Sequence, residues 1–340
     1  MPAKRTFYPR LRTRILRLTV FAVFTLSIAL FAVSAFAYKS LTTVASCGQP
    51  DQSDGGVTPA NFTLSERDAT AYRMSDYQSV QFPTRNGSIM LSGWYIPSDL
   101  SNQPTMIVVH GLSSCRQDAT ILLAAGILHR AGFNVLLIDL RNHGNSGKDN
   151  GLEAMGTKEY LDVLGAWDWL CNDKGARPEQ VGLLGFSLGA ISVIDAGGAE
   201  PRVAAVWADS PFYNADEEID YQIQYMGVVG KLKPLALLAG RVIFGDDLTN
   251  TQIQPAMMVT RYANRFLFIT QGADDVVIPS THLAQLVDAA HRANVPVESW
   301  LVVGSQHITA ILDQTGEYSS RLVTFFSKAL KGTTSTSESF

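Results

Sequence analysis

The sequence predicts an α/β protein with a mostly parallel sheet that helices cover on both faces, preceded by one membrane-spanning helix. Three observations lead to this prediction. Short apolar segments alternate with segments of helix length, a charge-free stretch lies close to the N-terminus, and 46% of the 340 residues are hydrophobic while 17% are charged. This composition favours a sizeable folded core over a disordered chain.

Basic residues crowd the N-terminus, residues 1–17, and no acidic residue precedes Asp51. They are Lys4, Arg5, Arg10, Arg12, Arg14 and Arg17. The next stretch, Leu18 to Tyr38, is uncharged and long enough to cross a bilayer core, which takes about 20 apolar residues. Because basic flanks stay in the cytoplasm, we expect residues 18–38 to be a single-pass anchor, with everything after it outside the cytoplasm.

A cleaved signal peptide is the alternative, and it would leave a secreted protein. Ala35-Phe36-Ala37 would serve as the cleavage site, but the apolar stretch is longer than the roughly 7–15 residues typical of such peptides. Length therefore favours an uncleaved anchor. A second alternative is a lipoprotein cleavage box, "VASC", although Lys39 and polar residues separate its Cys47 from the apolar stretch. Cys47, Cys115 and Cys171 have no metal-binding spacing and predict no particular disulfide.

The folded domain is expected to span residues 66–330. Residues 39–65 are polar and rich in Ser, Thr, Gly and Pro, which is typical of a linker, and residues 331–340 are expected to be a disordered tail. The domain opens with alternating polar and apolar residues on either side of Asn86-Gly87, which is the signal of a β-hairpin.

Six continuously apolar strands are predicted after the hairpin, at 105–111, 134–141, 180–187, 202–210, 265–272 and 297–304. Apolar residues throughout a strand indicate burial on both faces, as in a parallel sheet. Helices are predicted between most of these strands, at 117–131, 157–173, 188–199 and 280–294. Residues 211–260 are too long for one crossover helix, and Gly and Pro divide them into short apolar helices. We expect this interval to be a cap over the strand ends, where open α/β sheets bind ligands.

A Gly-x-Ser-x-Gly motif, "GFSLG", lies between a predicted strand and a predicted helix and places Ser187 at its centre. This context is the one in which the motif marks a nucleophile, because the tight turn needs glycine on both sides and lifts the hydroxyl above the sheet. The alternative is a serine that merely caps the helix. A nucleophilic serine needs a base and an acid that orients the base, and in this chain order they follow as Asp or Glu and then His.

The two partners are sought in the loops that follow the last two strands. Asp274 and Asp275 follow the strand at 265–272, and His307 follows the strand at 297–304. Both loops leave the same sheet edge as Ser187, so the side chains can converge. His307 is the histidine with the required loop and chain order; the pattern alone does not choose between the two aspartates.

The sequence resembles the α/β-hydrolase superfamily, especially its serine aminopeptidase-like and dienelactone hydrolase-like branches. Four motifs over residues 78–330 carry the resemblance: "HGLSS", "DLRNHGNSG", "GFSLG", and "GADDVVIP" followed by "GSQH". The resemblance implies an α/β-hydrolase fold and selects Asp275 over Asp274, from the spacing to Gly272 and Pro279. It also implies that His110 is structural.

Two backbone N–H groups are expected to form an oxyanion hole, one from Leu188 and one from Leu112. Within "DLRNHGNSG" we expect Asn142 to adopt a left-handed backbone where the family commonly has glycine. The resemblance assigns this turn a structural role, and no metal and no organic cofactor are implied. No basic stripe stands out and the net charge is −4, so nucleic acid is not an expected partner.

These observations predict a membrane-anchored serine hydrolase that cleaves an ester or thioester of a small molecule through an acyl-enzyme. One alternative is an aminopeptidase-like enzyme, which would need a carboxylate in the cap to hold the substrate ammonium. The candidates for that carboxylate are Asp216, Glu217, Glu218 and Asp220. The other alternative is a non-enzymatic binding protein on the same fold.

Overall fold

The computed structural model describes residues 9–45, 47, 56–65, 67–224, 226–227 and 230–331. The chain forms two compact units. The helical unit contains helix α1 (Pro9–Thr42) and the segment Ile223–Asp247. The sheet unit contains Thr43–Gln222 and the chain from Leu248 onward.

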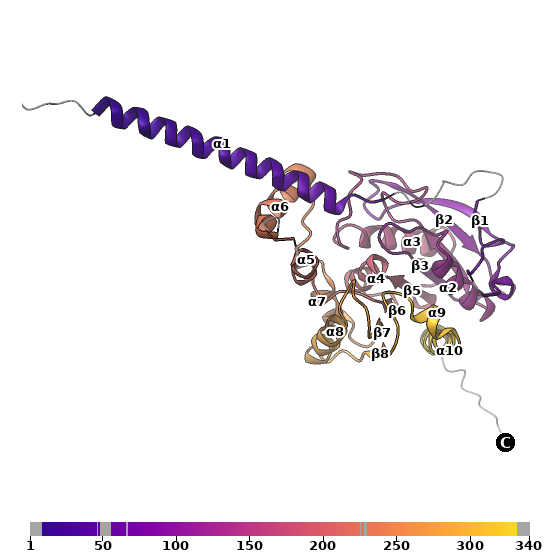
Figure 1. The fold of residues 1–340 in the computed structure, drawn as a ribbon. Coiled ribbons are helices and arrows are strands. Elements are labelled where there is room, and N and C mark those ends of the chain that lie inside the picture. Colours follow the sequence, from indigo (N-terminus) through magenta and orange to yellow (C-terminus); the bar gives the residue numbers. More distant parts are fainter. Residues whose placement is uncertain are drawn as a thin grey trace, which may run out of the picture. The chain divides into compact units, whose positions relative to one another are not determined.

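The sheet unit is built on an eight-stranded sheet with the order β1-β2-β4-β3-β5-β6-β7-β8 (Figure 1). Its first two strands form the predicted hairpin and run antiparallel to their neighbours, while all the other pairings are parallel. The bounds are β1 Gln78–Pro83, β2 Met90–Ile96, β3 Thr105–Val109, β4 Asn134–Ile138, β5 Val181–Phe186, β6 Ala205–Asp209, β7 Phe266–Gly272 and β8 Glu298–Val302. The predicted parallel sheet is confirmed.

The central strands are apolar throughout because the sheet has a hydrophobic core on each face. Successive side chains of a strand point to opposite faces, so Ile107 and Val109 of β3 enter one core while Met106 and Val108 enter the other. All four side chains are fully buried. This alternation explains why the strands lack the polar positions of a half-exposed sheet.

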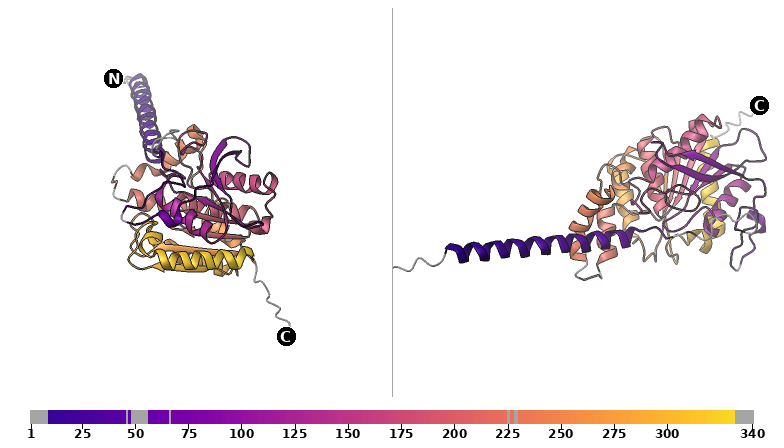
Figure 2. Two further views of the ribbon diagram at one scale, coloured as in Figure 1. Left: turned by 90° about the vertical axis from the view of Figure 1, so that its right-hand side faces the viewer. Right: turned by 90° about the horizontal axis from the view of Figure 1, so that it is seen from above.

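Helices cover both faces, as predicted. One core takes side chains from α3 (Tyr160–Asn172), α4 (Leu188–Ala199) and α8 (Thr281–Arg292). The other core takes side chains from α2 (Ala119–Arg130), α9 (Ala310–Asp313) and α10 (Thr315–Phe326), the last drawn in yellow in Figure 2. No helix was predicted at α9 or α10, although α10 buries Tyr318, Leu322, Phe325 and Phe326 at helical spacing.

The interval 211–260 consists of short helices, as expected, but it is shared between the two units. Its first helix, α5 (Ala215–Ile223), lies almost entirely in the sheet unit, as does α7 (Pro255–Met258). Between them, η3 (Gly230–Leu232), α6 (Lys233–Ala239) and η4 (Gly240–Phe244) belong to the helical unit, where α6 packs on α1. The role of residues 211–260 as a cap stays a prediction.

Helix α1 contains a span, Arg12–Thr42, that is long and apolar enough to cross a membrane. It begins at Pro9 and continues four residues beyond Tyr38, into the segment predicted as linker.

Residues 39–65 were predicted to be a linker, and this is wrong for part of the segment. Residues 39–42 are helical, Phe62 and Leu64 are buried in the core beside α2, and Cys47 forms a disulfide with Cys115. Two large apolar side chains in a polar segment are enough to dock it on the sheet unit. The disulfide also excludes the lipoprotein alternative, which requires the Cys47 sulfur to carry lipid. The predicted tail lies outside the described residues apart from Lys331.

Candidate active site

Ser187 lies on a strained turn between β5 and α4. Its backbone has φ 53° and ψ −118°, a conformation that residues other than glycine rarely adopt. The turn closes because its flanking glycines have no Cβ. A Cβ added to Gly185 would clash with the carbonyl of Gly189, and a Cβ added to Gly189 would clash with the carbonyl of Val109. The chain crosses from one side of β3 to the other at β5, so Ser187 lies at the switch point of the sheet.

A continuous chain of hydrogen bonds joins Ser187, His307 and Asp275. The distance from Ser187 Oγ to His307 Nε2 is 2.8 Å, and His307 Nδ1 lies 2.8 Å from Asp275 Oδ2. The three residues are 120 and 32 positions apart in sequence, and each follows the carboxyl end of a parallel strand. The geometry suits proton transfer from the serine hydroxyl to an imidazole that a carboxylate orients.

Asp275 and its neighbour Asp274 lie in different environments. Asp275 is buried and accepts hydrogen bonds from the Gln271 side chain and from the backbone N–H groups of Val277 and Ile278, at 2.8–2.9 Å. Asp274 is exposed, and its backbone N–H donates to the carbonyl of Ser305. Of the two aspartates, Asp275 is therefore the one brought to His307.

The two backbone groups predicted for an oxyanion hole belong to the loops that meet at Ser187. The loop after β3 approaches closely, since a Cβ on Gly111 would lie 3.1 Å from the Ser187 Cβ. The N–H of Leu112 comes next in that loop, and the N–H of Leu188 opens α4. Neither N–H has a hydrogen-bond partner among the described residues. Both are available to an oxygen that carries developing charge.

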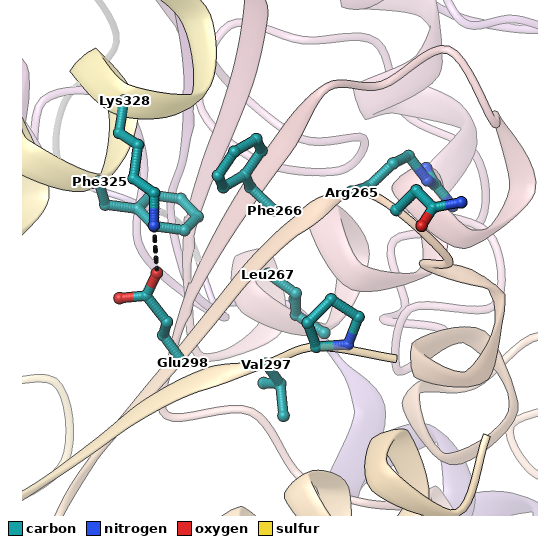
Figure 3. Close-up of a pocket in the computed structure, with 9 residues that line it drawn as sticks. Arg265, Phe266, Leu267, Val297, Glu298, Phe325 and Lys328 are labelled. Atoms are coloured by element: carbon teal, nitrogen blue, oxygen red, sulfur yellow. Dashed lines mark ion pairs between the residues drawn. The ribbon is translucent and has the colours of Figure 1, made fainter. Parts of the chain in front are cut away.

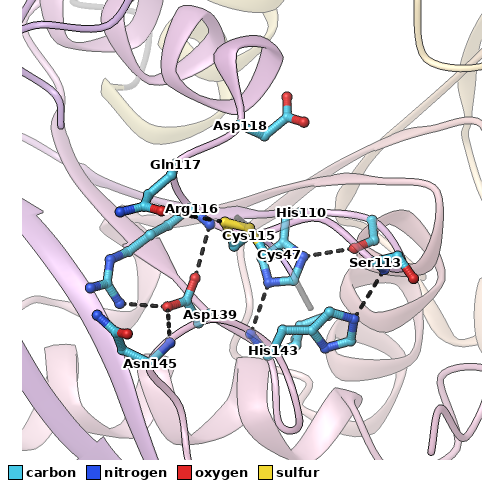
Figure 4. The surroundings of a disulfide bond; sticks show 12 residues. Cys47, His110, Ser113, Cys115, Arg116, Gln117, Asp118, Asp139, His143 and Asn145 are labelled. Atoms are coloured by element: carbon cyan, nitrogen blue, oxygen red, sulfur yellow. Dashed lines mark hydrogen bonds and ion pairs between the residues drawn. A yellow bond between two sulfur atoms is a disulfide. The ribbon is translucent and has the colours of Figure 1, made fainter. Parts of the chain in front are cut away.

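Two histidines brace the loops beside Ser187 (Figure 4). His110 Nε2 accepts from the Leu140 N–H at 3.0 Å, so its Nδ1 carries the proton and donates to the Gly111 carbonyl at 2.7 Å. Burial lowers the pKa of His110 to about 3, helped by nearby His143, so the ring is neutral. His143 Nε2 likewise accepts from the Ser113 N–H.

The same region holds the disulfide and a buried ion pair. The loop after β3, residues 110–118, is called the oxyanion loop below for the role predicted for Leu112. Its Cys115 is bonded to Cys47, and its Ser113 Oγ accepts from the Ala45 N–H at 3.2 Å. Arg116 pairs with Asp139 at 2.6 Å, and both side chains are almost fully buried. The loop that carries Leu112 is thus held by a covalent bond, an ion pair and two histidines. Asn142 has the predicted left-handed backbone, with φ 65°.

A second buried carboxyl group, Asp209, supports the loop that carries His307. It accepts from Tyr318 Oη at 2.8 Å and from Ser210 Oγ at 2.9 Å, and Ser210 Oγ also accepts from the Ile308 N–H at 3.3 Å. Burial raises the pKa of Asp209 to about 6. Asp209 was not among the predicted site residues, although it is the last residue of the apolar strand β6 and lies at the same sheet edge as Ser187.

The four acidic residues of α5 do not share one environment. Asp216, Glu217 and Asp220 are exposed. Glu218 is buried, lies 3.4 Å from His282 Nε2 and accepts from the Gln222 side chain at 2.6 Å. The one buried carboxylate of α5 therefore already interacts with His282 and Gln222 of the same chain.

A cavity of about 240 Å³ lies at the amino ends of β7 and β8, between Phe266, Pro296, Glu298 and Phe325 (Figure 3). Glu298 and Lys328 form an ion pair across it at 3.6 Å. Ser187, Asp275 and His307 follow the carboxyl ends of their strands, so this cavity is at the opposite edge of the sheet.

A sequence model of the prolyl oligopeptidase family matches residues 123–333, more than half of the chain. The match includes Ser187, Asp275 and His307.

Several curated proteins are similar over part of the chain. "Thiohydrolase aneE" of Aspergillus aculeatus is 29% identical over 41% of this chain and 43% of its own length. "Protein ABHD12B" of Homo sapiens is 26% identical over 59% of this chain and 53% of its own. The chain thus spans about half the length of these relatives.

Solved structures share the fold over most of the chain. An esterase of Pyrococcus furiosus has a TM-score of 0.63 at 21% identity, with 85% of this chain and 99% of that chain covered. An acylaminoacyl peptidase of Pyrococcus horikoshii has a TM-score of 0.57 at 17% identity, with 78% of this chain and 43% of that chain covered. At these identities the likeness shows the α/β-hydrolase fold alone.

Proposed function

Because this chain belongs to the prolyl oligopeptidase family of α/β hydrolases, we propose that it is a serine hydrolase that cleaves an ester or thioester through an acyl-enzyme. The observation that carries the proposal is the hydrogen-bonded chain of 2.8 Å contacts from Ser187 through His307 to Asp275.

In the first half-reaction, Ser187 Oγ attacks the carbonyl carbon of the substrate and gives its proton to His307 Nε2. His307 Nδ1 keeps its proton, because it faces the Asp275 carboxylate. The imidazolium formed in this step is stabilised by that buried carboxylate, which three donors other than His307 hold in place.

The carbonyl oxygen becomes an oxyanion and accepts from the N–H groups of Leu112 and Leu188. When the tetrahedral intermediate collapses, His307 Nε2 returns the proton to the leaving oxygen or sulfur. Water then attacks the acyl-enzyme, with His307 as its base, and releases the acid and Ser187. Losing one oxyanion donor typically costs about 2.7–4 kcal/mol of transition-state stabilisation.

We further propose that α1 is an uncleaved anchor with its N-terminus in the cytoplasm and the sheet unit outside it. The basic N-terminal flank supports this orientation. The disulfide between Cys47 and Cys115 is an independent argument, because disulfides persist in oxidising compartments and are rare in the cytosol.

The proposal is tested by the Ser187→Ala variant with 4-nitrophenyl butyrate as a soluble substrate. We expect kcat to fall by roughly 10⁴–10⁶, as when a nucleophilic serine is removed elsewhere. Ser299→Ala, which removes an exposed hydroxyl on β8, is the matched control and keeps wild-type activity. Undiminished hydrolysis by Ser187→Ala contradicts the proposal.

Peptide cleavage is the second candidate function, and the family assignment favours it. Turnover of the butyrate ester is compared with that of an aminoacyl 4-nitroanilide. We expect kcat/KM for the ester to exceed that for the amide, because Glu218, the buried carboxylate of α5, is engaged with His282 and Gln222. A preference for the amide identifies a peptidase.

A further inference from the structure

The segment Gly230–Asp247, called the insert below, interrupts the hydrolase chain and packs on the C-terminal turns of α1. The Tyr38 ring stacks on the Phe244 ring with centroids 5.4 Å apart, and a Cβ on Gly240 would clash with Tyr38. Ser34 and Ala239 are fully buried. The insert therefore lies at the level where the predicted spanning stretch, Leu18 to Tyr38, ends.

The insert exposes large apolar side chains although it packs on α1. Leu238 is 47% exposed, Val242 70% and Ile243 52%. Basic side chains accompany them, namely Lys231, Lys233 and Arg241. Exposed aliphatic residues with flanking Lys and Arg are typical of segments that lie in the headgroup region of a bilayer. Tyr38 fits the same level, since tyrosine is enriched at membrane interfaces.

The chain connects the helical unit directly to the loops of the candidate active site. Just before the insert, Tyr221 Oη donates to the Val276 carbonyl at 3.1 Å and the Gln222 side chain donates to the Val277 carbonyl at 2.8 Å, next to Asp275. Just after α1, the Ala45 N–H donates to Ser113 in the oxyanion loop. Ala45 lies three residues after the end of α1, and Gln222 is adjacent in sequence to Ile223, where the chain returns to the helical unit.

The rim of the site is itself apolar. Val276 and Val277 follow Asp275 and are exposed, and Leu112 of the oxyanion loop is exposed as well. Ile191, Phe212, Ala215 and Ile278 form a small buried cluster, in which Ile191 lies on the first turns of α4 after Ser187 and Ile278 lies three residues after Asp275. These side chains favour an apolar acyl group over a charged one.

We propose that the insert docks in the membrane leaflet that α1 enters on the side of the sheet unit, and that the substrate is an acyl ester or thioester whose chain is dissolved in that leaflet. This inference rests on the proposed function. The membrane is the partner, and α1 tethers the unit that carries Ser187 to the bilayer that holds the acyl chain.

Docking is tested on the full-length protein in phosphatidylcholine vesicles, in a Cys171→Ala background that removes the free thiol. A fluorophore is attached to V242C, and a matched one to V303C, an exposed valine after β8. Doxyl-labelled lipid is expected to quench the label at 242 at least threefold more than the label at 303. Equal quenching of the two labels, with equal access of aqueous iodide, overturns the proposal.

The substrate class is tested by the ratio of two hydrolysis rates, that of a 4-nitrophenyl palmitate dissolved in the vesicles and that of soluble 4-nitrophenyl butyrate. V242N/I243N is expected to lower this ratio at least fivefold. L301N/V303N changes two exposed apolar residues at β8 and leaves the ratio unchanged. An unchanged ratio in V242N/I243N overturns the inference, whereas butyrate hydrolysis that survives Ser187→Ala overturns the proposed function instead.

Discussion

The two units of the chain place the same kinds of side chain in opposite environments. In the sheet unit, Ile107 and Leu183 are completely buried. In α1, Leu18 is 68% exposed and Phe21 is 65% exposed. Only 6% of the 18-residue stretch that makes this helix apolar enough to span a membrane is buried. The sheet unit therefore buries its apolar residues in its own core, whereas α1 leaves its apolar side chains exposed, as we expect of a helix that lies in a bilayer.

This difference separates two tasks within one chain. The sheet unit holds the polar groups that can do chemistry, fixed by its core and by the hydrogen bonds of its loops. The helical unit offers apolar surface and lacks the nucleophile and the base. Changes at the site residues of the sheet unit should therefore alter hydrolysis of a soluble ester without altering the proposed membrane attachment. Changes in the helical unit should alter that attachment without altering hydrolysis of the soluble ester.

After Ser187→Ala, the largest expected effect comes from Asp275→Asn in the sheet unit. The amide cannot hold the imidazole in the required tautomer or stabilise the imidazolium, so we expect kcat to fall by about 10⁴. Asp274→Asn is the matched control, because Asp274 is exposed and does not bind His307. Steady-state kinetics on the butyrate ester compares them. Equal losses in the two variants would place the orienting acid elsewhere.

The next effect comes from removing the disulfide with Cys47→Ala and Cys115→Ala together. We expect the sheet unit to lose about 2–5 kcal/mol of stability, the range for native disulfides of secreted domains. Thermal unfolding with and without reductant measures the loss, and Cys171→Ala serves as the control. If reductant lowers the melting temperature of the double variant as much as that of the wild type, the stabilisation does not come from this bond.

A charge placed in α1 is expected to weaken attachment to the membrane and to leave hydrolysis of the soluble butyrate ester unchanged. Ile28→Arg puts a guanidinium near the middle of the predicted span, at a cost of about 2.5–3.5 kcal/mol of insertion free energy. Val303→Arg places the same charge on the sheet unit. The fraction that stays membrane-bound after alkaline extraction is measured for the two variants. An equal fraction in both would contradict the proposal that α1, and not the sheet unit, attaches the chain to the membrane.

The last effect depends on pH and concerns Asp195, a completely buried carboxyl group on α4 whose oxygens have no hydrogen-bond partner among the described residues. Burial raises its pKa well above the usual value, with a contribution from Glu159. The folded chain therefore keeps a proton that the unfolded chain releases above about pH 4. As the pH rises from there toward the pKa of Asp195 in the fold, the free energy of unfolding falls by up to about 1.4 kcal/mol per pH unit.

Asp195→Asn removes this titration. Its stability advantage over the wild type should grow between pH 5 and 7 and vanish near pH 3.5, as chemical denaturation at several pH values would show. An advantage that does not change with pH would mean that Asp195 is ionised in the fold.

Most of the sheet unit could be predicted from the sequence, because its strands carry continuous apolar runs and its motifs fix the order of the site residues. Ser187 was predictable from two glycines whose role is purely steric. Asp275 needed the spacing of a known family, since Asp274 is chemically identical and only burial separates the two.

Other features depend on tertiary contacts that no local pattern encodes. The bond between Cys47 and Cys115 spans 68 residues, and its partners have no distinctive spacing. Phe62 and Leu64 are isolated apolar residues in a polar segment, so their burial was missed. The burial of Tyr318 could have been predicted, because α10 has an apolar face at helical spacing. The hydrogen bond from Tyr318 to Asp209 could not have been predicted.

The most direct test of the central claim is to label the full-length protein with a fluorophosphonate and locate the adduct by peptide mass spectrometry. We expect one adduct, on Ser187, which forms in step with the loss of butyrate hydrolysis. It should be absent in Ser187→Ala and form much more slowly in His307→Ala. An active protein that carries no adduct, or carries it on another serine, would contradict the account.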